Sequence, residues 1–145
     1  FREIREQRGL AYAVYSFKVP YADSGGYGVY AGTTPSQTEQ VLSLIDDELK
    51  KLIADGITSE ELERAKGHVQ GSLALSEEDP NSRMIRLGRD EIAGLEHLSL
   101  DETLARYDSV TLADVHTVAG ELLSGPKVIG ATGPHDIAEL EPFVS

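Results

Sequence analysis

Residues 11–19 alternate between two faces with a period of two, which is the pattern of a β-strand. The alternation places Ala11, Ala13, Tyr15, Phe17 and Val19 on one face, and Tyr12, Val14, Ser16 and Lys18 on the other. Residues 20–26 contain the Pro, Asp, Ser and Gly typical of turns, and residues 27–33 indicate a second strand. The pattern therefore predicts an antiparallel hairpin.

Much of the remaining chain has apolar residues at the three- and four-residue spacing of amphipathic helices. Three helix starts are marked by a Ser or Thr cap with Glu or Gln three positions later. These pairs are Thr34 with Gln37, Thr58 with Glu61, and Ser99 with Glu102. Two further helices are expected, one after the break at Asp79-Pro80 and one beginning at Thr111 and Asp114.

The two ends of the chain add one helix and one strand. Residues 1–8 are amphipathic and are expected to form a helix that ends at Gly9, the usual residue for a left-handed cap. Residues 127–132 (Lys-Val-Ile-Gly-Ala-Thr), bounded by Gly-Pro pairs, predict a final short strand. The amphipathic run begins at Phe1 with nothing before it, so we expect the chain to be a fragment or a processed product.

The order of these elements, with strands grouped and helices in a run, predicts an α+β fold. We expect a small, mostly antiparallel sheet with helices packed on one face. No linker or internal repeat interrupts the sequence, so residues 1–145 are expected to be a single domain. Three strands make a thin sheet, which suggests that part of the domain lies upstream.

Composition narrows the classes of partner. Hydrophobic residues make up 40% and charged residues 26% of the chain, as in an ordinary globular protein. The net charge of −12 argues against nucleic-acid binding, which requires a basic surface. No apolar stretch approaches the ~18 residues of a membrane span, and nothing signals export, so we expect a cytoplasmic protein without membrane partners.

The sequence lacks the usual catalytic and metal-binding motifs. There is no cysteine, and His68, His97, His116 and His135 have no partner histidine three or four residues away. Neither H-E-x-x-H nor H-x-x-E-H occurs, so no metal ligand is predicted in this chain, although a site built from distant histidines stays open. The acidic run 77–79 ends a helix where the dipole disfavours negative charge, and the sequence gives no reason for it.

Arg5 and Tyr12 are the candidate functional pair. Arg5 lies one helical turn before the Gly9 cap, and the chain reverses there, so the two side chains can approach each other. A guanidinium and a phenol held together can bind a peptide carbonyl or a developing oxyanion. An arginine stacked on a structural tyrosine fits the same spacing.

Three segments carry a resemblance to a known family. They are the run Arg-Glu-x-Arg-Gly-Leu-Ala-Tyr ending at Tyr12, the run Gly-Tyr-Gly-Val-Tyr-Ala-Gly-Thr in residues 26–33, and residues 58–66 followed by Gly71, Ser72, Leu73, Glu78 and Asp79. In order and spacing they resemble the second, zinc-free domain of the pitrilysin and mitochondrial-processing-peptidase family of zinc metallopeptidases. The resemblance extends from Phe1 to about residue 130.

The resemblance implies one half of a clamshell around an enclosed chamber. A partner domain, either a zinc-bearing N-terminal half or a homologous subunit, would hold Zn²⁺ on an H-x-x-E-H helix. Arg5 and Tyr12 would hold the peptide substrate, with Tyr12 helping to stabilise the tetrahedral intermediate. The resemblance implies a substrate-binding, non-catalytic domain of a zinc endopeptidase that is inactive by itself.

Two other interpretations stay open. The first is an inactive structural subunit of the same family, which would share every motif described above. The second is a self-contained metal enzyme built from the scattered histidines.

Overall fold

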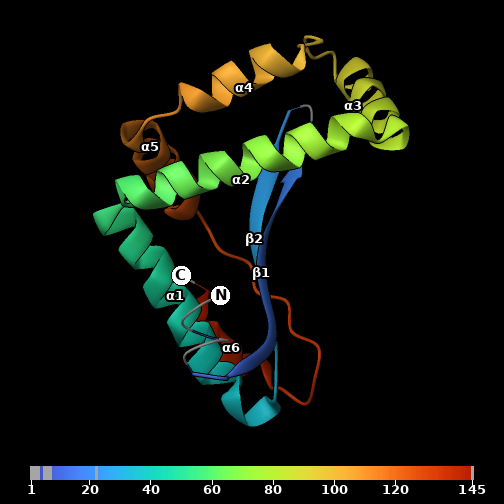
Figure 1. The fold of residues 1–145 in the computed structure, drawn as a ribbon. Helices are drawn as coiled ribbons and strands as arrows, with labels where there is room; N and C mark the ends of the chain where they lie inside the picture. Colours follow the sequence, from blue (N-terminus) through green and yellow to red (C-terminus); the bar gives the residue numbers. More distant parts are fainter. Residues whose placement is uncertain (1–3, 5–7, 22, 145) are drawn as a thin grey trace. The chain divides into compact units, whose positions relative to one another are not determined.

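The structure is a computed structural model that describes residues 4, 8–21 and 23–144 (Figure 1). The chain divides into two compact units, one formed by residues 1–55 and 118–145 and the other by residues 56–117. We describe each unit by itself. The combination of helices with a two-stranded antiparallel sheet confirms the predicted α+β class.

The first unit is built on the predicted hairpin. Strand β1 (Ala11–Pro20) pairs antiparallel with β2 (Gly25–Thr33), and the amide of Tyr21 closes the turn by donating to the carbonyl of Ser24 at 2.9 Å. The register is regular from Ala13 opposite Gly32 to the turn, with one irregularity between Ala11 and Ala13. That irregularity sets the direction of Tyr12.

One helix covers one face of the hairpin. After a short 3-10 turn, η2 (Pro35–Gln37), helix α1 (Thr38–Asp55) places Val41 against the strands. A cluster of buried residues, which we call the core cluster, joins them: Ile4, Leu10, Ala11, Val14 and Val41, with Ala31, Leu44 and Ile45 packed against it. Helix packing on one sheet face is therefore confirmed.

The cap predicted at Thr34 differs in detail from the structure. The Thr34 side chain makes no capping bond to the backbone and instead donates to Oε1 of Gln37 at 3.0 Å. The regular helix begins at Thr38, because the proline at position 35 opens a 3-10 turn first.

The C-terminal part of this unit contains α6 (Ile137–Leu140) and η3 (Glu141–Phe143), and Nζ of Lys127 lies 2.6 Å from Oδ1 of Asp46 on α1. The strand predicted over residues 127–132 is not present in the structure. Residues 125–130 alternate between half-buried and exposed side chains, as a strand would, but no ladder pairs them. A period-two pattern needs a neighbouring strand to become a sheet, and the pattern alone does not supply one.

The second unit is helical. It contains α2 (Ser59–Glu78), α3 (Pro80–Ile92), α4 (Leu100–Asp108) and the first half of α5 (Leu112–Leu123). Both predicted capping boxes, at Thr58 and Ser99, are present with reciprocal hydrogen bonds. Contacts from α2 hold α4, since Nζ of Lys66 donates to the carbonyl of Asp108 at 2.8 Å.

The acidic run at the end of α2 has a structural explanation. Asp79 caps α3, because its carboxylate accepts from the backbone amides of Asn81 and Ser82. Glu77 pairs with Nη2 of Arg86 at 2.5 Å, and Nε of Arg83 lies 3.8 Å away. These residues join α2 to α3 at the Asp79-Pro80 corner. Among the described residues, no helix is long and apolar enough to cross a membrane.

Candidate functional site

A β-bulge orients Tyr12. Ala11 pairs with Thr33 and Ala13 pairs with Gly32, so Tyr12 is an extra residue on β1 with no partner of its own on β2. Residues 12 and 13 of the bulge both oppose Gly32, and the Tyr12 ring lies directly over Gly32. The predicted alternation is therefore wrong at this point. Tyr12 lies on the same face as Ala13, while Ala11 lies with Val14 in the core cluster on the other face.

Glycines on β2 make room for aromatic rings from β1. A Cβ atom at position 32 would collide with Cζ and the hydroxyl of Tyr12, and one at position 28 would collide with the ring of Phe17. Both positions therefore require the absence of a side chain, and the rings lie flat on the strand. The sequence analysis gave these glycines no role in the site, although the period-two spacing of Gly28, Tyr30 and Gly32 places them on one face of β2.

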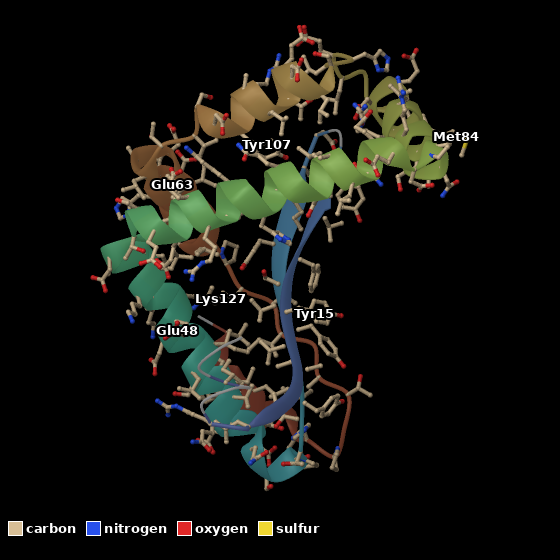
Figure 2. All side chains as sticks on the ribbon, viewed as in Figure 1. Tyr15, Glu48, Glu63, Met84, Tyr107 and Lys127 are labelled. Carbon is tan, nitrogen blue, oxygen red and sulfur yellow. The ribbon has the colours of Figure 1, made fainter. Side chains whose placement is uncertain are left out.

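The result is an exposed aromatic face, which we define as Tyr12, Tyr15, Phe17 and Tyr30. Tyr15 and Tyr30 are cross-strand partners, and their rings stack with centroids 5.0 Å apart at an interplanar angle of 26°. Phe17 follows with its centroid 6.2 Å from that of Tyr15. Figure 2 shows Tyr15 on the side of the hairpin turned away from α1.

The Tyr12 hydroxyl is both accessible and held. The side chain is 72% exposed. A hydrogen bond to the Tyr30 hydroxyl, followed by the electrostatic influence of Tyr30, raises the pKa of Tyr12 above its usual value. A raised pKa means that the neutral phenol is favoured. Tyr12 therefore remains a hydrogen-bond donor at physiological pH.

Arg5, the other predicted site residue, lies outside the described residues. The backbone next to it is described: Gly9 has a φ of +61°, as expected for the left-handed cap, and the carbonyl of Ile4 accepts from the amide of Leu10 at 2.9 Å. Oγ1 of Thr33 donates to the carbonyl of Leu10 at 2.5 Å. These bonds fix the entry of the chain into β1 just before the bulge.

The histidines do not converge. Within residues 4, 8–21 and 23–144, no group of three or more His, Cys, Asp or Glu side chains could hold a metal ion. His97 lies 2.8 Å from Oε2 of Glu91, and His135 lies 3.3 Å from the Thr38 hydroxyl and 3.4 Å from Glu139. The donor sets in this part of the chain do not fit zinc.

A cavity of about 860 Å³ lies within the first unit. It is bounded by the hairpin, by α1 and by residues 122–143, and Tyr12 and Phe17 contribute to its lining. Its charged groups include Asp46 and Lys127, which neutralise each other. We assign no chemistry to it, and the aromatic face with Tyr12 remains the candidate site.

Comparison with known proteins identifies the family. A protein-family model described as "Peptidase M16 inactive domain" matches residues 1–68, which include Arg5, Tyr12 and the whole hairpin. This match to the peptidase M16 inactive-domain family covers just under half of the chain. The recognition made from the three sequence motifs is thereby confirmed.

Curated relatives carry zinc-protease names. The chain is 45% identical over 134 residues to an "uncharacterized zinc protease" of Streptomyces coelicolor, covering 92% of this chain and 29% of that protein. Proteins with the same description occur in Mycobacterium tuberculosis, with 44% identity over 93% of this chain and 31% of the relative, and in Bacillus subtilis, with 40% over 92% and 33%. The chain thus spans about a third of the length of these relatives.

A solved structure shares the fold. A conserved protein from Enterococcus faecalis matches 82% of this chain with a TM-score of 0.71 and 25% identity, and the match covers 28% of that protein. The region matched by this chain is therefore about a third or less of each of these longer proteins.

Proposed function

We propose that this M16 inactive domain binds the peptide substrate of a zinc-dependent endopeptidase and supplies Tyr12 to the reaction. The observation that carries the proposal is the position of Tyr12. It is an exposed, neutral phenol on a bulge, held over a glycine at the start of a family-matched hairpin. A core tyrosine would be buried, and a freely mobile surface tyrosine would not have a glycine kept clear beneath it.

The chemistry of a phenol in this position is hydrogen-bond donation. Hydrolysis of a peptide bond places negative charge on the former carbonyl oxygen, and a preorganised donor stabilises that charge. In this proposal the Tyr12 hydroxyl donates to that oxygen, and the Arg5 guanidinium donates to the substrate backbone nearby. Both residues hold and orient the peptide, and neither acts as a nucleophile or as a base.

Zinc belongs to the partner in this proposal. The relatives' names include zinc, whereas the described residues of this chain contain no donor set that fits the ion. The zinc-bearing partner is either an N-terminal half of the same polypeptide or a homologous subunit. The two halves would enclose the peptide in a chamber.

The first test compares cleavage of a quenched fluorogenic peptide by this chain alone and by the chain mixed with a zinc-bearing half. We expect cleavage only in the mixture, and its loss on chelation of the metal. Cleavage by the chain alone would overturn the assignment. If the two halves associate and the mixture does not cleave the peptide, the result would favour the alternative interpretation, an inactive structural subunit.

The second test is Tyr12→Phe in the assembled peptidase. Loss of one oxyanion donor lowers turnover by about 10²–10³, and zinc content should be unchanged. Tyr21→Phe is the matched control, because Tyr21 is 68% exposed at the hairpin turn and lies outside the aromatic face. Full turnover in Tyr12→Phe would refute the role of the hydroxyl.

A further inference from the structure

Tyr30 is the aromatic neighbour that hydrogen-bonds with Tyr12. The Tyr12 ring extends over Gly32, and Tyr30 projects from the same face of β2 two residues away. Hydrogen bonding with Tyr30 is the first cause of the raised pKa of Tyr12. The Tyr12 ring therefore packs against Gly32, and its hydroxyl interacts with that of Tyr30.

Tyr30 is itself fixed. Its ring stacks on Tyr15, the residue directly opposite it in the ladder, at a centroid distance of 5.0 Å. Strand β2 is paired with β1 from Gly25 onward, so the backbone that carries Tyr30 belongs to the regular part of the hairpin. Tyr12, in contrast, is the unpaired residue of a bulge, where the ladder does not fix the backbone as tightly.

We propose that Tyr30 is a positioning residue for Tyr12: its hydroxyl, held by the stack on Tyr15, fixes the place of the Tyr12 hydroxyl above the aromatic face. This inference rests on the proposed function, since it gives a second residue a part in the same site. Tyr30 does not touch the reacting atoms. It acts through Tyr12.

The pair can also change the direction of its hydrogen bond. A bond in which Tyr12 donates to Tyr30 agrees with the raised pKa of Tyr12. A phenol both donates and accepts, so when a substrate oxygen accepts from Tyr12, the Tyr30 hydroxyl can turn its hydrogen toward the Tyr12 oxygen. Donation into a donor strengthens it, because hydrogen bonds in a chain polarise one another. Tyr30 would then assist Tyr12 most when the substrate oxygen carries charge.

Gly32 has a part in the same arrangement. A Cβ atom there would meet Cζ and the hydroxyl of Tyr12, so Gly32→Ala displaces the ring without touching Tyr30 directly. The φ of Gly32 lies outside the left-handed region, so alanine fits its backbone. We expect Gly32→Ala to lower kcat in the assembled peptidase as Tyr30→Phe does.

The first experiment is NMR of the full 145-residue chain and needs no peptidase activity. In Tyr30→Phe the ring and its stack on Tyr15 remain, and only the hydroxyl is lost. We expect weaker nuclear Overhauser contacts between the Tyr12 ring and the Gly32 α-protons at neutral pH, and a Tyr12 pKa that falls toward 10.0, the ordinary value. Tyr27→Phe is the control, because Tyr27 pairs with Lys18 and projects from the other face of β2.

The second experiment is kinetic and uses the chain assembled with its zinc-bearing half. Tyr30→Phe should lower kcat by roughly fivefold, the effect of one net hydrogen bond, with KM unchanged. The double variant with Tyr12→Phe should be no slower than Tyr12→Phe alone, because Tyr30 acts only through Tyr12.

The two experiments separate the two proposals. Tyr12 contacts and a Tyr12 pKa that are the same in Tyr30→Phe as in the wild type would overturn the positioning role, whatever the kinetics. If Tyr30→Phe alters the Tyr12 contacts and the Tyr12 pKa in the NMR experiment, but Tyr12→Phe retains full turnover, the positioning role is supported and the proposed function is refuted. Additive kinetic effects in the double variant would also overturn the positioning role.

Discussion

Val41→Ala tests whether the core cluster holds the hairpin against α1. Val41 is 2% exposed and is the largest side chain of the described residues to be essentially fully enclosed. It packs with Leu10, Ala11 and Val14, which flank the bulge that carries Tyr12. Truncating it therefore removes contacts from the foundation of the candidate site.

The magnitude follows from the atoms removed. Valine to alanine deletes two methyl-sized groups, and each fully buried group of this size contributes about 0.8 kcal/mol, which gives about 1.6 kcal/mol in transfer free energy. The cavity left behind adds to this cost because neighbouring residues relax only in part, so we expect a total loss of about 2–3 kcal/mol in the free energy of unfolding.

The tyrosines make the assay selective for the first unit. Five of the six tyrosines lie in residues 12–30, and the sixth is Tyr107 in the second unit. Urea unfolding followed by near-ultraviolet circular dichroism therefore reports mainly on the hairpin. Val128→Ala is the control, since Val128 is 94% exposed and the same truncation there should change stability by less than about 0.5 kcal/mol. Equal midpoints for the two variants would refute the reasoning.

Three further predictions concern polar contacts. Ser99→Ala removes the side-chain acceptor of the α4 capping box and should cost about 1 kcal/mol in urea unfolding followed by far-ultraviolet circular dichroism, whereas no loss would mean that the cap is not formed in solution. Hydrogen bonds from the Ser99 side chain and backbone lower the pKa of Glu102, so its contribution is present above the unfolded-state pKa and is lost as pH falls through the folded-state pKa. Glu102→Gln should therefore flatten the decline of the thermal midpoint on acidification, and a decline as steep as in the wild type would contradict this. Lys127→Met removes the larger of the two ammonium contacts that lower the pKa of Asp46, so carboxylate NMR titration should show that pKa rising toward its ordinary value, and an unchanged titration would contradict the ion pair.

Features that depend on neighbours in sequence were predictable. The capping boxes at Thr58 and Ser99 and the break at Asp79-Pro80 each involve residues within a few positions, and the structure has all of them. The left-handed cap at Gly9 belongs to the same class. For these positions, local chemistry determines local backbone geometry.

Features that depend on distant partners were not predictable. The alternation in residues 125–130 is visible in sequence and in burial, yet a strand exists only where a ladder partner lies beside it. The acidic run at residue 79 had no explanation until Arg86 on α3 was seen to pair with Glu77.

The candidate site combines both kinds of feature. Tyr12 could be selected by resemblance, but its direction depends on a bulge that a period-two pattern cannot reveal. Tyr30 and Gly32 become part of the site only once the register places them beside the Tyr12 ring.

The bulge has a consequence for insertions and deletions. Ala11 pairs with Thr33 and Ala13 with the adjacent Gly32, so a chain lacking residue 12 could join these two pairs into an uninterrupted ladder. Ala11 and Val14 would keep their places in the core cluster. Tyr12 is in this sense an added residue, because the pairs on either side of it oppose neighbouring residues of β2. A variant that lacks residue 12 would therefore test pairing of the hairpin separately from the role of the Tyr12 side chain in the site.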